Sequence, residues 1–385
     1  MTSALNLNKM KIPFNKPYLS GKEITYLNEA VNSGKLSGNG IFTKKCHEFF
    51  ESKYGFNKCL LTTSCTDALE MAAILIDTKE GDEIIMPSYT FVSTANAFVL
   101  RGAKIVFADS NKSNPNIDVS KLEQLITEKT KAIVPVHYAG IACDMDEIMR
   151  IANKYNLFVI EDAAQAIDSY YKDKPLGSFG NLSAFSFHET KNIISGEGGM
   201  LVINDNKLLK RAEIIWEKGT NRAEFFRGEV NKYGWVDIGS SFLPSEITAA
   251  FLFAQLEKVK EIQKHRKELW KYYYKNLKFL EQEKKIILPY LPDYATNNAH
   301  MFYFVCNDFN TQKNLLNYLN KKGILAVFHY LSLHSSLYYI NKHDKRILEQ
   351  SDRYSNCLVR LPLYFELTEN EQLYIVKHIT NFFNS

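Results

Sequence analysis

The sequence has 385 residues, a length typical of about two to three domains, or of one large domain with a smaller appendage. Hydrophobic residues make up 45% of the chain and charged residues 23%, and there are only 18 Gly and 10 Pro, which excludes a disordered or low-complexity protein. The formal net charge of +4 is too small for the basic surface of a nucleic-acid-binding protein, so we expect no nucleic acid partner.

The cysteines and the apolar runs predict a cytoplasmic protein without a metal centre. The six cysteines are scattered, with neither a C-x-x-C pair nor the short ligand spacing of zinc sites. No apolar run approaches the roughly 18 residues of a membrane span, and residues 1–10 lack the apolar stretch of a secretory signal. We therefore expect reduced thiols, no membrane span and a location in the cytoplasm.

Between residues 58 and 205 the sequence repeats a short apolar run, a turn and a helical stretch. Several runs are apolar throughout, which is typical of strands buried on both faces of a mostly parallel sheet. The predicted strands are 58–63, 83–89, 103–109, 132–137, 157–162, 184–188 and 200–204. The predicted helices between them are 66–76, 93–100, 120–127 and 144–155. This alternation predicts an α/β domain that binds ligands at the carboxyl ends of its strands.

The pattern changes after about residue 244. Residues 244–274 indicate one long connecting helix, in which apolar positions are followed by a run of Lys, Glu and Arg. The segments 300–306, 315–322, 324–328 and 369–383 then alternate between strand-like and helix-like patterns. We predict a large α/β domain over residues 1–250, and a connecting helix with a small α+β domain over residues 251–385. The N-terminal segment is expected to pack on the small domain.

Three features of the predicted α/β domain carry candidate chemistry. Lys191 follows a predicted strand and precedes the glycine-rich turn Gly196–Gly199, although a solvated loop lysine would fit that stretch equally well. Asp162 ends a buried strand, where an acid also serves as a helix cap. Ser64 and Thr66 flank a predicted helix start, whose free N–H groups favour phosphate, although an N-cap needs only one such hydroxyl.

Together the three features fit pyridoxal 5′-phosphate (PLP). The Lys191 amine can react with the aldehyde of PLP, and an ionised Asp162 keeps the pyridine nitrogen protonated so that the ring accepts electrons. The same lysine is placed to move a proton between the substrate and the cofactor. The G-x-G-x-x-G and G-x-x-x-x-G-K-[ST] motifs are absent from the predicted phosphate site, which argues against a dinucleotide or P-loop site.

Several motifs resemble those of the DegT/DnrJ/EryC family of sugar nucleotide aminotransferases, and the resemblance extends over nearly the whole chain. The most specific are Glu161–Gln165, Ser186–Asn192 and Gly196–Gly199. Further similar segments are Asn15–Pro17, Ser33–Gly38, Met86–Thr94, Val134–Gly140 and Ala326–Tyr330. The resemblance implies a fold-type-I, PLP-dependent aminotransferase that forms a homodimer in which both subunits contribute to each active site.

The resemblance also implies roles for single residues. Lys191 would bind the cofactor covalently, Asp162 would pair with the pyridine nitrogen, and Gln165 would lie beside the ring hydroxyl oxygen. The remaining implied cofactor contacts are Thr66, Asp67 and Ser186 to the phosphate, Phe91 stacked on the ring, and Ser241. Ser241 stands where many members have an Asn that reaches the phosphate across the dimer interface. The candidate substrate contacts are Asn192, His329 and Tyr330, although a hydrogen-bonded structural histidine is the more frequent role for a residue such as His329.

The stretch around Lys191 and the segment 218–228 resemble members that act on a nucleotide-linked 4-keto-6-deoxy sugar with L-glutamate. The implied reaction converts dTDP-4-dehydro-6-deoxy-D-glucose to dTDP-4-amino-4,6-dideoxy-D-galactose and 2-oxoglutarate, for lipopolysaccharide or enterobacterial common antigen. Amination to the equatorial epimer or at C3, and a UDP-linked substrate, stay open. A PLP-dependent sugar dehydratase fits less well because such relatives replace the lysine with His. The intact Lys191, Asp162 and Gln165 set argues against a non-catalytic sensor.

Overall fold

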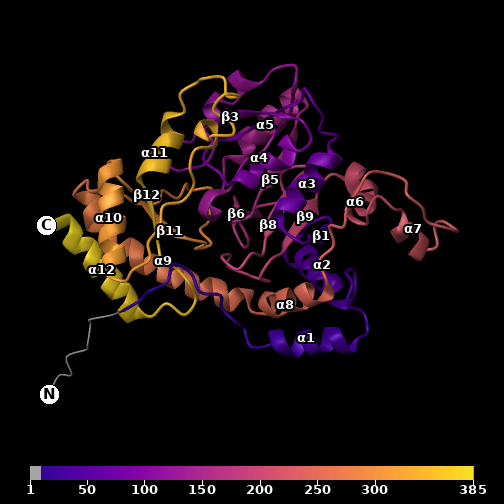
Figure 1. Ribbon diagram of the computed structural model, residues 1–385, viewed down its shortest axis with the longest axis horizontal. Helices are drawn as coiled ribbons and strands as arrows, with labels where there is room; N and C mark the ends of the chain where they lie inside the picture. The colour runs from indigo at the N-terminus through magenta and orange to yellow at the C-terminus, as the bar shows by residue number, and fades with distance from the viewer. Residues whose placement is uncertain (1–9, 385) are drawn as a thin grey trace.

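The computed structural model describes residues 10–384. Its largest feature is a seven-stranded sheet with the order β1-β9-β8-β5-β4-β2-β3 (Figure 1). Its strands are β1 (Cys59–Thr62), β2 (Glu83–Pro87), β3 (Lys104–Ala108), β4 (Thr130–Ile133), β5 (Phe158–Asp162), β8 (Leu182–Ser186) and β9 (Gly199–Ile203). Neighbouring strands are parallel except that β9 is antiparallel to both β1 and β8. Each strand overlaps a predicted one, and the α/β prediction is confirmed.

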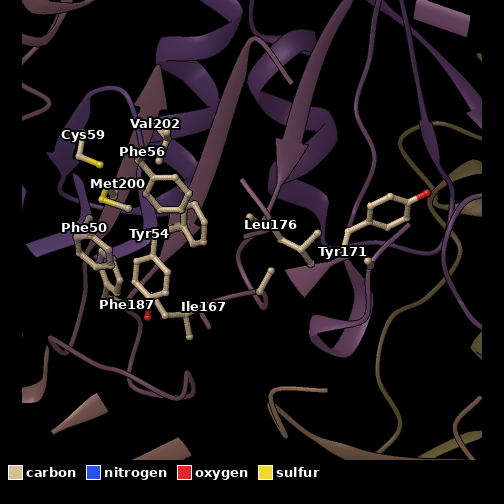
Figure 2. Close-up of a cluster of buried hydrophobic side chains, with 14 of the residues drawn as sticks. Phe50, Tyr54, Phe56, Cys59, Ile167, Tyr171, Leu176, Phe187, Met200 and Val202 are labelled. Carbon is tan, nitrogen blue, oxygen red and sulfur yellow. The ribbon is translucent and has the colours of Figure 1, made fainter. Parts of the chain in front are cut away.

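Helices cover both faces of this sheet, which explains why its strands are apolar throughout. Consecutive strand residues enter different clusters, as Ile84 and Ile85 do. The first cluster includes side chains of α2 (Ile41–Tyr54), α5 (Met145–Tyr155) and α8 (Glu246–Glu257), and there the ring of Phe50 stacks on Tyr54 and Phe187 (Figure 2). The second cluster includes side chains of α3 (Cys65–Leu75), α4 (Val92–Val99) and α6 (Leu209–Trp216).

Two predicted helices differ from those in the structure. The segment 244–274 is not one helix, because α8 ends at Glu257 and α9 (Val259–Gln282) begins after Lys258, where φ is −103° and ψ is 6°. The segment 120–127 forms only two short 3₁₀ turns, η1 (Val119–Lys121) and η2 (Glu123–Leu125). Leu122 is its only fully buried residue, so an α-helix there would gain little from packing.

The C-terminal region has its own sheet and core. Its strands β10 (Ile286–Ile287), β11 (Phe302–Cys306) and β12 (Leu358–Leu361) are antiparallel. Together with α9, the helices α10 (Phe309–Lys321) and α12 (Glu369–Asn384) supply the third cluster. The segment 324–328 is not a regular strand and makes only single bridges, one of which joins Ile324 to Ile12 near the chain start. The division at residue 250 stays a prediction; along α8 and α9 the packing changes from the first cluster at Ile262 to the third at Leu269.

The shorter elements complete the chain. They are α1 (Glu23–Asn32), β6 (Tyr170–Tyr171), β7 (Lys174–Pro175), η3 (Tyr138–Gly140), η4 (Asn206–Leu208), α7 (Arg222–Phe226), η5 (Leu333–Ser335) and α11 (Glu349–Cys357). In Figure 1, α1 lies along α8 and α7 stands away from the sheet at the right of the view. Between residues 10 and 384, no helix combines the length and the apolar character needed to cross a bilayer.

Candidate active site

A cavity of about 550 Å³ lies where the carboxyl ends of β5 and β8 meet the start of α3 and the C-terminal region. Its position follows from topology, because parallel strands present their carboxyl ends on one edge of a sheet. The sequence-predicted residues that line it are Thr66, Phe91, Asp162, Gln165, Ser186, Lys191, His329 and Tyr330. The structure therefore brings together residues that are far apart in the sequence.

Lys191 contributes an amine to this cavity that has no protein partner. Its backbone N–H donates to His188 O at 2.9 Å in the turn after β8, but no hydrogen bond or ion pair in the described part of the chain involves its side chain. Burial lowers the pKa of Lys191 below its ordinary value of 10.5; Cys65 and Asp162 oppose that shift, and the charge of Arg360 adds to it. A lysine with a lowered pKa holds more of its amine in the neutral, nucleophilic form.

Asp162 presents a buried carboxylate at the end of β5. Its Oδ2 accepts a hydrogen bond from Thr94 Oγ1 at 2.7 Å, and its Oδ1 accepts one from the backbone N–H of Ala164 at 3.1 Å. Burial raises the pKa of Asp162, while these two bonds and the charge of Lys191 oppose the shift. The Thr94 hydroxyl is in turn bonded to Thr90 at 2.9 Å, so the carboxylate is fixed in orientation. A fixed, desolvated carboxylate favours a cationic ligand such as a protonated pyridine nitrogen.

Gln165 and Tyr330 form a hydrogen-bonded side of the cavity. Gln165 Oε1 accepts from the backbone N–H of Ala139 at 2.6 Å, and its Nε2 donates to Tyr330 Oη at 2.9 Å. The His329 ring stacks on Tyr330 with centroids 3.5 Å apart, and its Nδ1 lies 2.8 Å from Tyr138 Oη. Burial lowers the pKa of His329 well below its ordinary value, so the ring is neutral.

The start of α3 lies at the edge of the cavity. Ser64 is the N-cap, and its Oγ accepts from the backbone N–H of Asp67 at 3.1 Å. Thr66 lines the cavity, and its hydroxyl donates to Ser93 Oγ at 2.9 Å. Gly199 in β9 lies so close that a Cβ there would overlap the backbone of Ser64 and Cys65. The bare glycine thus lets the sheet approach the helix start, where free N–H groups favour a phosphate.

Three predicted residues lie apart from this cavity or at its edge. Asp67 does not line it, and its carboxylate accepts from the hydroxyls of Thr63 and Ser64. Asn192 is buried behind it: its Nδ2 donates to Gln263 Oε1 at 2.7 Å and to Asn298 O at 2.8 Å. Ser241 lines a different, second cavity.

Phe91 and His300 show how the cavity differs from the sequence expectations. Phe91 lines the cavity and is 56% exposed, with its ring centroid 6.1 Å from that of Tyr330. His300 lines the cavity and was not predicted; its Nδ1 lies 2.9 Å from Asn192 Oδ1. Because an amide oxygen can only accept, Nδ1–H of His300 donates to it. Burial lowers the pKa of His300 well below its ordinary value, so the ring is neutral. Asn192 therefore positions a cavity residue and does not itself line the cavity.

Other lining residues escaped the sequence analysis, among them Phe14, Cys65 and Arg360. Arg360 had a signal that could have found it, because it interrupts the otherwise apolar strand β12. Phe14 and Cys65 had none, since an aromatic residue near the chain start and a cysteine in a helix are ordinary features.

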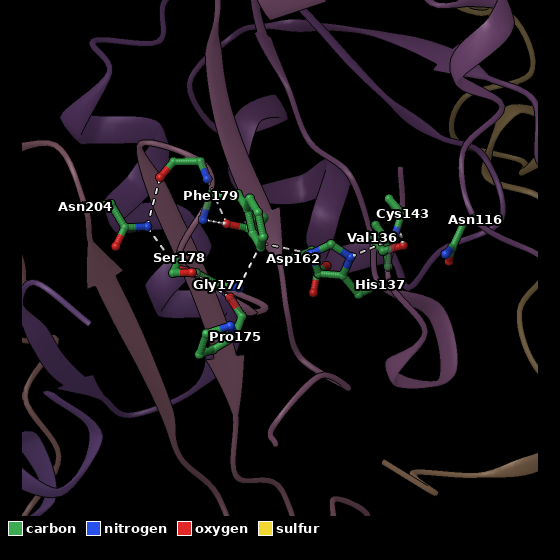
Figure 3. A network of polar contacts seen from close by, with 12 residues as sticks. Asn116, Val136, His137, Cys143, Asp162, Pro175, Gly177, Ser178, Phe179 and Asn204 are labelled. Atoms are coloured by element: carbon green, nitrogen blue, oxygen red, sulfur yellow. Dashed lines mark hydrogen bonds and ion pairs between the residues drawn. The ribbon is translucent and has the colours of Figure 1, made fainter. Parts of the chain in front are cut away.

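Glu161, next to Asp162, anchors the end of β5 from the opposite side. Its two oxygens accept hydrogen bonds from the backbone N–H groups of Gly177, Phe179 and Gly180 at 2.7–2.8 Å, and Oε2 lies 3.0 Å from Nε2 of His137. Figure 3 shows the network that contains Gly177, Phe179 and His137, beside Asp162. Burial alone would raise the pKa of Glu161, but these bonds lower it overall. The carboxylate thus fixes the strand end that carries Asp162.

The residues present fit PLP on three observations of this structure. The buried Lys191 amine has no protein partner, the Asp162 carboxylate is oriented by two hydrogen bonds, and the α3 start has a capped, closely packed phosphate edge. These are the groups that an aldehyde, a pyridine nitrogen and a phosphate require on one ligand.

Comparisons with known proteins agree with this chemistry. The profile of the DegT/DnrJ/EryC1/StrS aminotransferase family matches residues 17–380. GDP-perosamine synthase of Escherichia coli O157:H7 is 33% identical over 97% of this chain and 99% of its own, and the spore coat polysaccharide biosynthesis protein SpsC of Bacillus subtilis is 31% identical over 94% of each chain. The structure of Helicobacter pylori PseC, an aminotransferase involved in the biosynthesis of pseudoaminic acid, aligns with a TM-score of 0.87 at 27% identity, covering 97% of this chain and 100% of PseC. The protein belongs to the DegT/DnrJ/EryC1/StrS family and is a PLP-dependent sugar nucleotide aminotransferase.

Proposed function

We propose that the protein transfers the amino group of L-glutamate to a nucleotide-linked 4-keto-6-deoxy sugar. The proposed reaction converts dTDP-4-dehydro-6-deoxy-D-glucose to dTDP-4-amino-4,6-dideoxy-D-galactose and 2-oxoglutarate. The observation that carries an amino-transfer reaction at this site is the unpartnered Lys191 amine in one cavity with the oriented Asp162 carboxylate. The 4-keto position and the galacto product rest on the resemblance of the segment 218–228 and of the sequence around Lys191.

In this proposal each residue has one task. PLP, when bound, carries the amino group between the two substrates and stabilises the carbanion formed when a C–H bond breaks. Lys191 holds the cofactor and moves the proton at the substrate carbon. Asp162 keeps the pyridine nitrogen protonated, and Gln165 lies beside the ring hydroxyl oxygen. The phosphate is held by Thr66, Ser186 and the free N–H groups of α3, with Phe91 over the ring.

A GDP-linked sugar is the second candidate substrate. It is favoured by one observation, namely that the relative from Escherichia coli O157:H7 named GDP-perosamine synthase matches nearly the full chain at 33% identity. The equatorial 4-amino product, a 3-amino sugar and a UDP-linked substrate remain further outcomes of the same assay. The name of the Bacillus subtilis relative, a spore coat polysaccharide biosynthesis protein, supports a role in making a cell-surface polysaccharide, and we place that role in the cytoplasm.

The proposal includes a homodimer in which Ser241 serves the partner's site. Ser241 is exposed and lines the second cavity, whose cationic residues are Lys35, Lys44, Lys218 and Arg222. Beside it, Trp235 is 85% exposed and Phe226 is 69% exposed, and large exposed aromatic groups gather at protein interfaces. Light scattering tests this proposal. We expect the wild type to be a dimer and Trp235→Glu to be an inactive monomer. A wild type that is monomeric and fully active would overturn the proposal.

The function is tested by product analysis with purified holoenzyme. The protein is incubated with L-glutamate and, in parallel, with the dTDP-, GDP- and UDP-linked 4-keto-6-deoxy sugars and a 3-keto sugar; products are identified by mass and proton NMR. An axial 4-amine from the dTDP sugar, absent with Lys191→Ala, is the expected result. An equatorial amine, or preference for the GDP sugar, would reject the galacto assignment or the dTDP assignment. No amine from any of these sugars would reject the 4-keto-6-deoxy proposal.

A further inference from the structure

His300 contributes to the wall of the active-site cavity an imidazole ring on a residue that is only 5% exposed. Its backbone is fixed on both sides: the N–H donates to Asn298 Oδ1 at 3.0 Å, and the carbonyl oxygen accepts from Arg266 Nη2 at 2.8 Å. Arg266 also donates through Nε to Ala299 O at 3.1 Å. The backbone that carries the ring is therefore held in place, and the chemistry of the ring depends on which nitrogen carries the proton.

A chain of buried amides fixes that proton. Gln263 Nε2 donates to Ile167 O at 3.2 Å, so its Oε1 is the atom that accepts from Asn192 Nδ2 at 2.7 Å. Asn192 Nδ2 also donates to Asn298 O at 2.8 Å, which leaves Asn192 Oδ1 facing His300 Nδ1 at 2.9 Å. Backbone carbonyl oxygens only accept, so both side-chain amides in this chain have one orientation, and Nδ1 of His300 must carry the proton.

Nε2 of His300 is therefore a hydrogen-bond acceptor, because in a neutral imidazole one nitrogen donates and the other accepts. Burial lowers the pKa of His300 well below its ordinary value, which keeps the ring neutral. The charges of Lys191, Arg360 and Arg266 add to this shift. Among residues 10–384 no hydrogen bond or ion pair involves Nε2. A buried acceptor without a donor is costly, so we expect this atom to receive a donor in the working enzyme.

Lys191 supplies the matching donor. It lines the same cavity, its amine has no protein partner, and Asn192, the residue that follows it, is the one bonded to His300. Among the charged groups, Lys191 contributes most after burial to the lowered pKa of His300, which agrees with an amine that lies near the ring. When Lys191 takes a proton from a substrate carbon, it becomes an ammonium ion with three donors. Burial and the charge of Arg360 disfavour that ion, so it needs an acceptor.

The other groups that face this pair do not offer that acceptor. They are Cys65, Asp162, Arg266, His329 and Arg360. Each oxygen of Asp162 already accepts one hydrogen bond, and the proposed function commits its charge to the pyridine nitrogen. Burial raises the pKa of the Cys65 thiol well above its ordinary value, so it carries no charge. Arg266 donates only to backbone carbonyl oxygens, and its charge helps to keep His300 unprotonated while the lysine is charged.

We propose that His300 Nε2 accepts a hydrogen bond from the ε-ammonium group of Lys191 and holds that group where it moves the proton at the substrate carbon. His300 is thus a positioning residue for Lys191, and the amides of Asn192 and Gln263 set the tautomer that lets it accept. The inference rests on the proposed function in one respect, that Lys191 holds the cofactor and moves the proton. It does not depend on which sugar or which amino acid the enzyme uses.

The first test reads the tautomer directly in the apoprotein. Long-range ¹H–¹⁵N NMR of protein labelled with ¹⁵N-histidine distinguishes the Nδ1–H, Nε2–H and doubly protonated rings, and His300→Gln identifies the signals of His300. We expect a neutral Nδ1–H ring at neutral pH. Asn192→Leu removes the acceptor of Nδ1–H and should let the Nε2–H tautomer appear. An Nε2–H or doubly protonated ring in the wild type would overturn the inference.

The second test measures the pKa of Lys191 through the pH dependence of recombination of the apoprotein with PLP, followed by the absorbance of the bound cofactor. His300→Asn keeps a donor for Asn192 but is too short to replace Nε2. A hydrogen bond to the charged amine favours that form, so this variant should lower the midpoint by about one to two pH units. An unchanged or raised midpoint would overturn the inference, because a purely structural role predicts no downward shift.

Two further variants make this shift specific. His300→Gln places an amide oxygen near the position of Nε2, so it should keep the midpoint within about half a pH unit of wild type. His334→Asn is the matched control, because it removes a buried imidazole that does not line the cavity. It should keep the wild-type midpoint. A downward shift in His334→Asn equal to that in His300→Asn would overturn the inference.

The third test separates Lys191 from the substrates. Because Lys191 serves both half-reactions, His300→Asn should slow amination of the cofactor by L-glutamate and amination of the sugar nucleotide alike, by about 10-fold or more, with apparent dissociation constants within about threefold of wild type. A loss confined to the sugar half would assign Nε2 to a hydroxyl group of the sugar and overturn the inference.

The outcomes also separate this inference from the proposed function. Covalently bound PLP is detected by mass after borohydride reduction, and its persistence in Lys191→Ala would reject the role of Lys191 and the inference together. A wild-type enzyme that aminates none of the tested sugars would reject the sugar assignment alone. The tautomer and the recombination midpoint, which need neither substrate, would then still decide the role of His300.

Discussion

Replacing Glu161 by Gln tests how the end of β5 is held. Each Glu161 oxygen accepts two hydrogen bonds: Oε1 from the N–H groups of Phe179 and Gly180, and Oε2 from that of Gly177 and from His137 Nε2. A Gln side chain has one oxygen, and its NH₂ group would face two of these donors whichever way it is turned. His137 gives no relief, because its Nδ1 already accepts the Cys143 N–H at 3.2 Å and so Nε2 must carry the proton.

The expected cost follows from this count. Two buried donors lose their acceptor, and each unsatisfied donor costs about 1–3 kcal/mol, so Glu161→Gln should lower the free energy of unfolding by about 2–6 kcal/mol. The volume of the side chain is nearly unchanged, which leaves little room for a packing effect. Because Glu161 adjoins Asp162, the variant should also bind PLP more weakly.

Urea unfolding of the wild type, Glu161→Gln and the exposed control Glu128→Gln measures this cost. The control should differ from wild type by less than about 0.5 kcal/mol. A loss below about 1 kcal/mol in Glu161→Gln would refute the reasoning, because it would mean that the two donors left without an acceptor find other ones.

The pH dependence gives a second check on the same carboxylate. The pKa of Glu161 is lowered from an ordinary value of 4.5 in the folded protein, so its ionised form stabilises the fold above that pH. The stability difference between wild type and Glu161→Gln should therefore be constant near neutral pH and shrink as the pH falls below about 4.5. A difference that grows on acidification would contradict the assignment.

Three further predictions concern the cavity. Asp162→Asn should lower kcat about 100-fold or more with little loss of stability, because burial already disfavours the charged carboxylate; a kcat within tenfold of wild type would remove Asp162 from the mechanism. Gly199→Ala should weaken PLP binding, measured by equilibrium titration, since the new Cβ overlaps the backbone of Ser64 and Cys65, and unchanged affinity would contradict the phosphate edge. Recombination of the apoprotein with PLP should rise with pH around a midpoint below 10.5, because burial lowers the pKa of Lys191 and more of the amine is neutral; a midpoint at or above that value would contradict the lowered pKa.

The sequence by itself determined the large sheet and the polar groups at its edge. Runs such as 83–89 and 157–162 are apolar at consecutive positions, and only a strand covered on both faces buries every side chain of such a run. Since the carboxyl ends of parallel strands share one edge, Asp162 and the turn that carries Lys191 had to lie near the start of α3. The local sequence pattern and the geometry of a parallel sheet were enough to place these residues near one another.

Only the tertiary structure decided the rest of the cavity. Arg360 lies in the C-terminal sheet, and its place depends on the register between β11 and β12 and on the packing of that sheet against the large one. His300 is held at the cavity wall by its hydrogen bond to Asn192. Phe14 lies in an N-terminal segment whose next residues contact residues 189 and 366. The break at Lys258 likewise interrupts a continuous helical pattern, and the change from the first cluster to the third falls within α9, between Ile262 and Leu269. Local periodicity cannot specify such contacts, because they depend on how separately folded surfaces pack together.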